Sequence, residues 1–439
     1  MSKANNSKSA GFFERAKKVL PGGVSRNTLL RGQHPLYVSH GKGCNVIDVD
    51  NVQRLDFANN MASHIHGHAF EPIVEAVSKQ LQRGSAFTMA TEAELLFAEH
   101  MCSRSPAFDK IRFVNSGTEA VMAGMKAARA HTGRSKIAKV EGSYHGAYDY
   151  AEVSQAPTPE NWGGIDHPNA VPLAWGTPEG VLDDMIIIPF NDPEKAVALL
   201  EEHADQIACV LIDPIPHRIG MVPVTAEFVQ ALRKWTTDNG ALLMFDEVIT
   251  FRSEVGGMQE RFDIAPDLTS MGKMIGGGFP VGALAGRDEV MDVFVNGRLP
   301  HSGTFSANPI TMTAGRVAME MFDADAVARL NKLGEYVRSS LLEVIKIADA
   351  PACVTGTGSL FRIHLKAEAP KNYREAHPSD TEKKALSALI DALYDNGIMM
   401  IHTGAMALST PMWHDEIDQL SEALLKSLGS IKHLLGTTK

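Results

Sequence analysis

Seven short apolar runs separated by helical patterns constrain the fold of this chain more than any other feature. The clearest helical patterns between them cover residues 119–131, 193–203 and 226–239. Continuous apolar strands that alternate with helices are typical of a mostly parallel sheet with both faces covered. We therefore predict an α/β fold around a mostly parallel seven-stranded sheet. Its strands are expected within KIRFVNS (110–116), KIAKVEG (136–142), DMIIIPF (184–190), IACVLIDP (207–214), ALLMFDEV (241–248), DLTSMGK (267–273) and PVGALAG (280–286).

The segments before the sheet region predict a short N-terminal unit. We expect disorder over residues 1–10, then a helix through ERAKKVL that stops at Pro21-Gly22-Gly23. Apolar and polar residues alternate over 35–60, which predicts a small β meander. The interval 154–180 has many prolines and glycines and no clear periodicity, and a loop of that length inside a domain is usually a lid or an interface element.

The segment after Pro309 predicts a second, smaller α+β domain. Its expected helices cover 310–322, 323–348, 383–396 and 415–435, with a strand pair in GTGSLFRIHLKA (356–367) and a strand in GIMMIH (397–402). Because single cores stop growing near ~250–300 residues, a chain of 439 residues is expected to form more than one unit. We predict an N-terminal segment over 1–65 that packs with the small domain, a large domain over 66–309 and a small domain over 310–439.

Composition excludes several classes of partner. The formal charge is −10 and the basic residues are dispersed, so we expect neither nucleic acid nor an anionic membrane surface to bind. No run approaches the ~20 apolar residues of a membrane span, and the first 18 residues lack the apolar core of a secretory signal. The four cysteines show no C-x-x-C spacing, so we expect neither a zinc site nor a redox pair, and a reducing cytoplasmic location.

Polar residues follow five of the apolar runs at their ends. They are Asn115 to Glu119, Gly142 to His145, Asp213, Asp246 and Lys273. In an open α/β sheet, ligands bind in the crevice beyond the carboxyl ends of the strands. The sequence therefore predicts one binding crevice that these five stretches share.

Ser116, Gly117 and Thr118 stand between a strand and a helix. Hydroxyls and backbone N–H groups at a helix N-terminus favour an anion such as phosphate, because the helix dipole and the unpaired donors point at it. The alternative is an ordinary capping box around Thr118 with no ligand. The motif alone leaves both open.

Asp246 and Lys273 have uses that depend on burial. A carboxylate buried at a strand end can hold a pyridine nitrogen protonated, although Asp246 and Glu247 could also be a solvated acidic pair. Lys273 precedes three glycines in TSMGKMIGGGFPVGALAG, and an apolar pocket would lower its pKa and leave a free amine for an aldehyde. The alternative for Lys273 alone is a lysine whose stem lies along the strand and whose charge reaches water.

Five motifs in order carry a resemblance to a known family. NSGTEA, SYHGAYD, FDEV, SMGKMIGGGFPVGA and HSGTFSANP resemble the class-III aminotransferases of fold type I, which use pyridoxal 5′-phosphate. ERAKKVLPGGVSR and GHAFEPIVEAV look like the branch of glutamate-1-semialdehyde 2,1-aminomutase and its allied aminotransferases. The likeness runs from about Phe12 to the C-terminus. It implies pyridoxal 5′-phosphate as the cofactor.

The resemblance assigns roles residue by residue. It makes Lys273 the Schiff-base lysine and proton shuttle, Asp246 the partner of the pyridine nitrogen and Tyr144 the residue that stacks on the ring. Ser116, Gly117 and Thr118 would hold the phosphate. Asp213 stands where many members carry Glu, and it keeps the charge with a shorter reach.

Thr304, within HSGTF, has a role that needs a second chain. The resemblance places it on the phosphate of the neighbouring subunit, which implies a homodimer with shared active sites. The chemistry implied is a ping-pong exchange, in which an amine leaves its amino group on the cofactor and an oxo acid then accepts it.

Substrate recognition depends on two arginines. Arg26 stands where related β-amino-acid aminotransferases carry a carboxylate-binding arginine, and Arg218 could meet a carboxylate as well. The alternatives are a surface arginine at 26 and a solvated loop arginine at 218. The stretch IHTGAMALS (401–409) offers His402 and Thr403 but lacks the mobile arginine of some relatives, which weakens the case for a dicarboxylate acceptor.

We predict an aminotransferase with a β-amino acid or amine donor and an oxo-acid acceptor. The mutase branch tends to place an aromatic near Asn60-Met61 and an acid after the GIMM strand, and this chain has neither. The alternatives are an intramolecular aminomutase, a cofactor-binding protein without turnover and, on GGGFPVG alone, a dehydrogenase. His64, His66 and His68 have metal-like spacing, but without a carboxylate nearby we expect no metal site.

Overall fold

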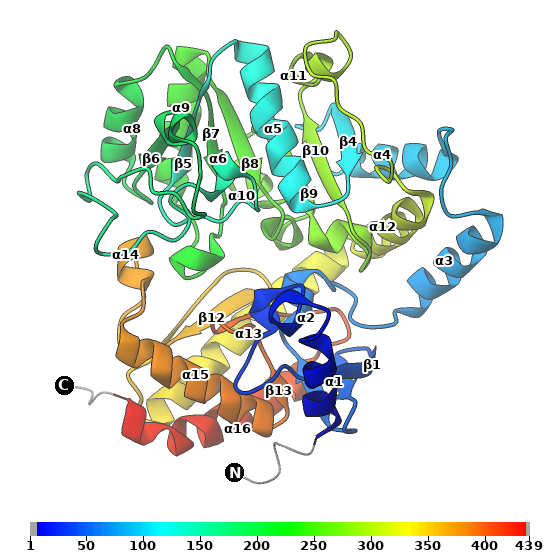
Figure 1. Cartoon of the computed structure of the whole chain (residues 1–439), viewed down its shortest axis with the longest axis vertical. Coiled ribbons are helices and arrows are strands. Elements are labelled where there is room, and N and C mark those ends of the chain that lie inside the picture. The colour runs from blue at the N-terminus through cyan, green and yellow to red at the C-terminus, as the bar shows by residue number, and fades with distance from the viewer. Residues whose placement is uncertain (1–6, 436–439) are drawn as a thin grey trace.

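The computed structural model describes residues 7–435, which form two lobes (Figure 1). The upper lobe is built around a seven-stranded sheet. The lower lobe combines the N-terminal strands with the C-terminal helices. No helix within residues 7–435 combines the length and the apolar character that crossing a bilayer requires.

The seven-stranded sheet confirms the predicted α/β fold. Its order is β4-β10-β9-β8-β7-β5-β6, and all pairs are parallel except the two that β10 makes with β4 and β9. β10 runs backwards because only nine residues separate it from β9, too few for the crossover that parallel strands need. The strands are β4 (Lys110–Val114), β5 (Lys136–Val140), β6 (Met185–Ile188), β7 (Ile207–Ile212), β8 (Leu242–Asp246), β9 (Leu268–Gly272) and β10 (Gly282–Gly286).

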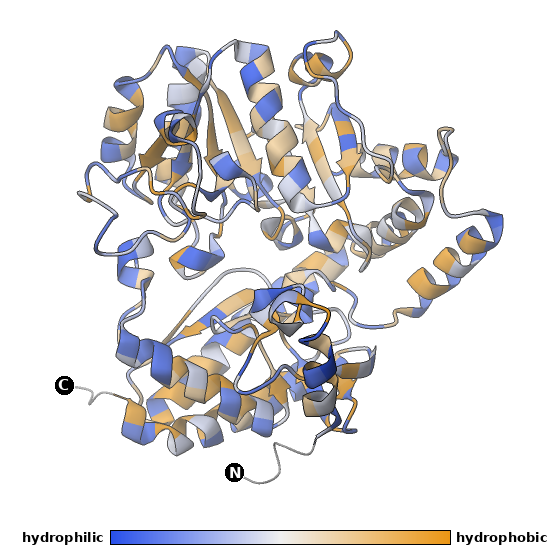
Figure 2. Ribbon diagram, in the orientation of Figure 1, coloured by the Kyte–Doolittle hydropathy of each residue, from blue (hydrophilic) through white to orange (hydrophobic). Residues whose placement is uncertain are grey.

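Both faces of this sheet are buried, which explains why the strands are continuously apolar. On β8, Leu242 and Met244 join the cluster on the side of α5, whereas Leu243 and Phe245 join the cluster on the side of α8 and α9. Figure 2 shows the hydrophobic strands enclosed by helices of mixed hydropathy. The helices of this lobe are α3 (Glu71–Arg83), α4 (Glu92–Ser103), α5 (Gly117–Thr132), α6 (Asp149–Glu152), α7 (Glu179–Asp183), α8 (Pro193–Glu201), α9 (Ala226–Asn239), α10 (Met258–Phe262) and α11 (Asp288–Met291).

Two small sheets form the lower lobe. β1 (Val38–Lys42), β2 (Asn45–Asp48) and β3 (Gln53–Asp56) make the predicted meander, and β13 (Ile398–Met399) pairs with β3 in parallel. The sequence 356–367 forms one strand rather than the expected pair. This strand, β12 (Leu360–His364), lies between β11 (Cys353–Thr355) and β14 (Ala405–Ala407) because its partners come from outside that stretch.

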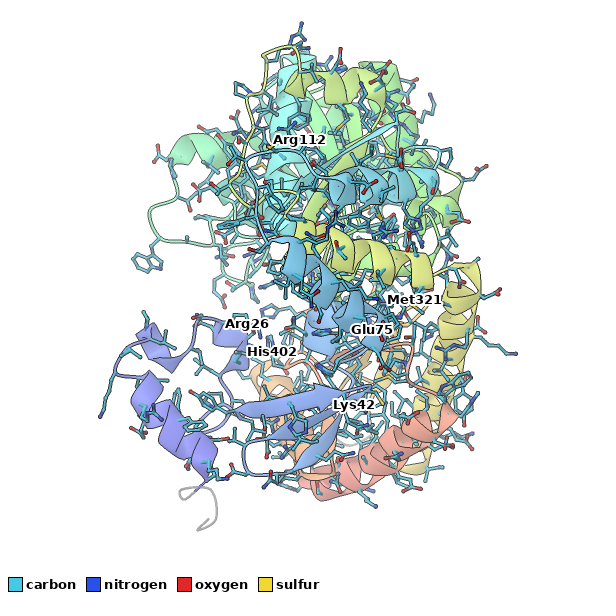
Figure 3. All side chains as sticks on the ribbon, turned by 90° about the vertical axis from the view of Figure 1, so that its right-hand side faces the viewer. Arg26, Lys42, Glu75, Arg112, Met321 and His402 are labelled. Atoms are coloured by element: carbon cyan, nitrogen blue, oxygen red, sulfur yellow. The ribbon has the colours of Figure 1, made fainter. Side chains whose placement is uncertain are left out.

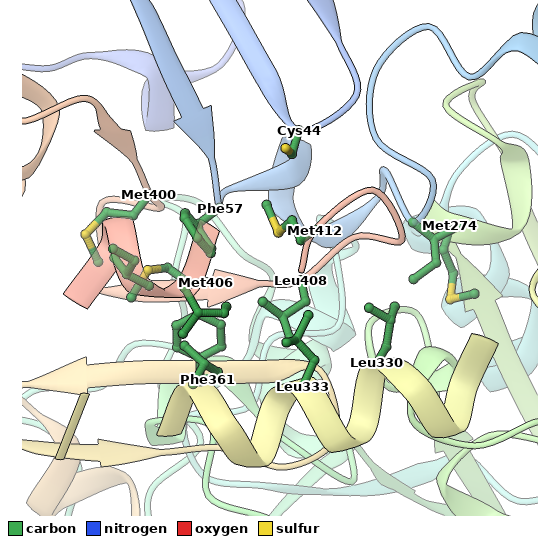
Figure 4. Packing of buried hydrophobic residues seen from close by; sticks show 14 of the residues in the cluster. Cys44, Phe57, Met274, Leu330, Leu333, Phe361, Met400, Met406, Leu408 and Met412 are labelled. Atoms are coloured by element: carbon green, nitrogen blue, oxygen red, sulfur yellow. The ribbon is translucent and has the colours of Figure 1, made fainter. Parts of the chain in front are cut away.

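Helices α12 to α16 cover the lower lobe and its junction with the upper one. Phe361 of β12 and Leu408 lie close to Leu330 and Leu333 of α13 in the shared core (Figure 4). Together with the two N-terminal helices, the helices of this part are α1 (Lys8–Ala16), α2 (Asn59–Ala62), α12 (Pro309–Met321), α13 (Ala324–Ile347), α14 (Tyr373–Ala376), α15 (Asp380–Asp395) and α16 (His414–Ser430).

Two expectations about the N-terminal segment need correction. α1 begins at Lys8, where Ser7 caps it, so residues 8–10 are helical rather than disordered; residues 1–6 lie outside the described residues. α1 also ends at Ala16, four residues earlier than expected. The predicted domain boundaries stay predictions.

The loop 154–180 contacts the short helix α14, which follows β12 in the chain. Arg374 donates to the carbonyls of Trp162 and Gly164 and pairs with Glu141 at 2.9 Å. The Tyr373 hydroxyl donates to the Pro157 carbonyl at 2.8 Å. These bonds tie the long loop to the segment between β12 and α15.

Candidate functional site

A crevice of about 380 Å³ lies beyond the carboxyl ends of the central strands, as the sequence predicted. The N-terminus of α5 forms one wall, and the ends of β7, β8 and β9 form another. Most of the predicted site residues meet here. They are Arg26, Ser116, Gly117, Thr118, Tyr144, Asp213, Asp246 and Lys273.

The N-terminus of α5 presents a cradle of hydroxyl and backbone N–H groups, which is the chemistry that a phosphate needs. The Ser116 hydroxyl caps the helix by accepting from the Glu119 N–H at 3.1 Å, so the cap is Ser116 and not Thr118. The N–H groups of Gly117 and Thr118 precede the first intrahelical bond and point out of the helix. A Cβ at Gly146 would lie 2.5 Å from the Thr118 hydroxyl oxygen, so glycine keeps the cradle open.

Asp246 ends β8 and is buried, so it is not the solvated acid that was one alternative. Its Oδ2 accepts from His145 Nδ1 at 2.7 Å, and its Oδ1 accepts from the Val248 N–H at 3.1 Å. Burial lowers the pKa of His145, although the bond to Asp246 acts in the opposite direction. A neutral His145 therefore holds the carboxylate in place at the crevice floor.

His145 is the site residue whose role the sequence analysis missed. It follows Tyr144 in SYHG, at the end of a predicted strand, so its position was foreseen. The contact to Asp246 joins residues 101 positions apart, and no spacing rule encodes it.

Asp213 lies beside Asp246 at the end of β7. Burial raises the pKa of Asp213 well above its usual value, and the charge of Asp246 raises it further. Its Oδ1 accepts from the Ile215 N–H at 2.9 Å, which fixes the side chain. A proton is therefore held more readily on Asp213 than on an exposed aspartate.

Lys273 follows β9 directly and has a strained backbone. Its φ of +51° is uncommon for a residue with a Cβ, and such strain is typical of functional sites. Burial lowers the pKa of Lys273, while Asp246 and Asp213 oppose that shift. The amine is therefore more often neutral, and thus nucleophilic, than a solvated lysine.

The glycines after Lys273 serve packing within the chain. A Cβ at Gly277 would lie 2.6 Å from the Ala314 carbonyl oxygen of α12, and one at Gly278 would lie 3.1 Å from the His64 ring. Gly277 also has a φ of +58°. Glycine at 277 thus lets the turn that carries Lys273 sit against α12.

Two predicted residues do not line this crevice. Arg218 lies over the Tyr144 ring, with its guanidinium carbon 5.6 Å from the ring centroid. Thr304 is exposed on the loop before α12. Its place is compatible with a contact to a second chain, and its role stays a prediction.

The three histidines at 64, 66 and 68 are engaged in other contacts. His66 bonds to Thr410 and to the Ala318 carbonyl, and His68 lies 2.7 Å from Asp56. Asp56 is thus a carboxylate near these histidines, contrary to the expectation from the sequence. Within residues 7–435, no group of three or more His, Cys, Asp or Glu residues is arranged to hold a metal ion.

A phosphate cradle, a buried aspartate and an activated lysine on this sheet define a pyridoxal-phosphate site of fold type I. The residues fit this cofactor, because the crevice offers a helix N-terminus for its phosphate, Asp246 for its ring nitrogen and Lys273 for its aldehyde. The chain belongs to the class-III aminotransferase family, whose model matches residues 29–430. A similar solved transaminase, 41% identical over 97% of this chain, has pyridoxal phosphate bound.

Individual relatives carry different activities in their names. Glutamate-1-semialdehyde 2,1-aminomutase of Methanothermobacter thermautotrophicus is 39% identical over 85% of this chain and 87% of its own. The structure of an omega-transaminase from Sphaerobacter thermophilus matches with a TM-score of 0.95 and 45% identity over 98% of this chain and 99% of that chain. A β-phenylalanine aminotransferase from Variovorax paradoxus matches with a TM-score of 0.88 and 32% identity over 99% of this chain and 96% of that chain.

Proposed function

We propose that this family member moves an amino group from a β-amino acid or a simple amine to an oxo acid in a ping-pong reaction. Arg26 carries the proposal: it lines the crevice, and its Nη1 donates to the Asn60 amide oxygen at 2.8 Å. A neutral amide leaves the charge of Arg26 available to a substrate carboxylate. The names of the two solved transaminases support an amine or β-amino-acid donor.

The residues of the crevice divide the tasks of this reaction among them. Pyridoxal 5′-phosphate supplies an aldehyde for the Lys273 amine and a ring that takes up electrons. The α5 N-terminus would bind the phosphate, and Tyr144 would pack on the ring. Asp246, oriented by His145, would face the ring nitrogen. Lys273 would also take the proton from the amine-bearing carbon of the substrate.

The second candidate is intramolecular amino transfer, which the name of the aminomutase relative favours. Against it, Met61 lines the crevice where that branch tends to place an aromatic. The two functions differ in stoichiometry. An aminotransferase without acceptor releases one equivalent of carbonyl product per site, whereas an aminomutase turns over an amino-aldehyde continuously.

The test is an assay of amine donors with and without added oxo acid. We expect a single turnover without acceptor and continuous turnover with it. Arg26→Ala should raise the KM of carboxylate donors by about 10- to 100-fold and leave simple amines unaffected. Arg15→Ala, an exposed arginine of α1, is the control. Continuous turnover of an amino-aldehyde without acceptor would sink the proposal.

We further propose a homodimer with shared active sites. Support comes from the loop 295–308, which contains Thr304 and in which Val295 is 78% and Phe305 61% exposed. Large exposed apolar side chains in one loop favour a partner surface. Sedimentation should give twice the chain mass of 47.5 kDa. A monomer that is fully active would contradict the shared site.

A further inference from the structure

A second and larger chamber adjoins the cofactor crevice. Its volume is about 760 Å³, and Arg26, Asn60 and Met61 line both spaces. Its other walls come from the N-terminal segment, from α15, from β12 and from the stretch 399–403. Figure 3 shows Arg26 and His402 near each other on the lower lobe, at its edge toward the upper lobe.

The chamber has carboxylates, but each already has a cationic partner. Asp48 pairs with Arg54 at 2.7 Å, and Asp56 pairs with His68 at 2.7 Å. Asp391 pairs with Arg31 at 2.5 Å. All three carboxylates that line the chamber therefore already have a cationic partner within the chain.

Several basic groups that line the chamber have no acidic partner among the described residues. Among residues 7–435, neither Arg26 nor Arg362 nor His402 takes part in an ion pair. In a chain of net charge −10, unpaired arginines gathered around one cavity indicate an anionic ligand. His64 also lines the chamber, but its ring packs against that of His68 with the centroids 4.8 Å apart. Arg26 is already assigned to one carboxylate, which leaves Arg362 and His402.

Arg362 has donor capacity that the protein does not fill. It lies on β12 with 8% of its surface exposed, and its Nη1 donates to the His217 carbonyl at 2.7 Å. Its Nε is buried without a partner among the described residues. Burial lowers the pKa of Arg362 to about 10, so it remains a cation at neutral pH. A buried N–H donor without an acceptor is unfavourable for folding. A bound anion would supply that acceptor.

Thr403 and His402 add donors to the same chamber. The Thr403 hydroxyl oxygen is buried, and no described residue bonds to it. Thr403 lies two residues before Ala405, which pairs with Arg362 across β12 and β14. Besides burial, the charges of Arg218 and Arg362 lower the pKa of His402, so the surroundings of its ring are positive.

We propose that Arg362, with Thr403 and His402 beside it, anchors the carboxylate remote from the reacting carbonyl of a dicarboxylic oxo-acid acceptor. The near carboxylate would bind Arg26 at the boundary of the two spaces. Arg362 on β12 thus takes the role for which the stretch 401–409 has no arginine. This inference rests on the proposed aminotransferase function, and it reverses the expectation that a dicarboxylate acceptor is disfavoured.

The first test compares acceptors in Arg362→Met. With one amine donor, the KM for 2-oxoglutarate should rise by about 10- to 100-fold while the KM for pyruvate changes little. Arg362→Lys should recover part of the loss. Arg338→Met is the matched control, because Arg338 also donates Nη1 to a carbonyl, that of Gly358 at 2.7 Å, and does not line the chamber.

The second test measures binding without turnover. Calorimetry of the holoenzyme with glutarate, a dicarboxylate that cannot react, should show binding that Arg362→Met abolishes and Thr403→Val weakens by about 3- to 10-fold. Thr403→Val and Arg362→Lys keep the test decisive if Arg362→Met does not fold.

Three outcomes would overturn the anchor. They are absence of glutarate binding by the wild-type holoenzyme, equal losses on pyruvate and 2-oxoglutarate, and an equal effect of Arg338→Met. Equal losses on the two acceptors would mean that Arg362 only stabilises the turn at His217 through its hydrogen bond. Glutarate binding through Arg362 in a protein that transfers no amino group to any oxo acid would contradict the proposed function and leave the anion site standing.

Discussion

Lys139 and Lys273 lie on the same sheet, the first fully buried and the second half-buried, and their surroundings are opposite. Lys139, near the end of β5, is 0% exposed and donates to the carbonyls of Ser143, Ala151 and Val153 at 2.9, 2.8 and 2.7 Å. Lys273, directly after β9, lines the crevice, and its amine makes no hydrogen bond to any residue within 7–435. Its nearest charges are the carboxylates of Asp246 and Asp213.

The difference shows that burial alone does not make a lysine reactive. Burial lowers the pKa of both side chains, that of Lys139 to about 7. In Lys139, three carbonyls accept the three N–H donors and hold the amine in place. These three hydrogen bonds fix the loop 143–153, which carries Tyr144 and His145. In Lys273 the amine is left free, so it can attack an aldehyde.

Lys273→Ala should produce the largest effect and separate the two lysines most clearly. We expect amino transfer to fall by at least about 1,000-fold, because the covalent anchor and the base are both lost. The melting temperature should stay near that of the wild type, since no hydrogen bond is removed. A variant that keeps more than about a tenth of the activity would remove Lys273 from the reaction.

Lys139→Met should act on stability. Three buried carbonyls lose their donor, so we expect a loss of about 3 kcal/mol in the free energy of unfolding. Activity per folded molecule should fall less than about tenfold. Lys136→Met, on the same strand with one carbonyl contact to Asp183, is the control and should change stability by less than about 1 kcal/mol. An equal loss of stability in both variants would contradict the stabilising role of the Lys139 hydrogen bonds.

The pH dependence of cofactor capture gives the smallest effect. The folded pKa of Lys273 lies below its ordinary 10.5, so the reactive neutral amine gains population as pH rises through that lowered pKa. Below it, the capture rate of pyridoxal 5′-phosphate by cofactor-free protein should rise about tenfold per pH unit. Visible absorbance measures this rate. A midpoint at 10.5 or above would show a solvated lysine, and Lys136→Met should leave the profile unchanged.

Local patterns in the sequence were enough to predict the sheet and the crevice. Each strand is apolar because both its faces are covered, and the polar residues at the strand ends converge because parallel strands share one carboxyl edge. Asp246 and Lys273 reach the crevice for that reason. β12 was misjudged because its partners β11 and β14 are distant in the chain, and sequence alternation does not name partners.

The parts that sequence could not predict depend on long-range contacts or on strain. The bond between His145 and Asp246 is one, and the position of Arg362 in the chamber is another. Residues 59–62 form a left-handed turn with φ between +44° and +66°. Left-handed turns are unfavourable for residues other than glycine, so only tertiary contacts explain it. Arg252, for example, donates to the Ala62 carbonyl at 3.3 Å.

The most direct test of the account is to identify which lysine carries the cofactor. Borohydride reduction of the holoprotein fixes the cofactor to its lysine, and peptide mass spectrometry then locates the adduct. We predict one adduct per chain, on the peptide that contains Lys273, and an unmodified Lys139. An adduct on Lys139 or on any other lysine, with Lys273 unmodified, would contradict the central claim that the free amine at the end of β9 is the reactive one.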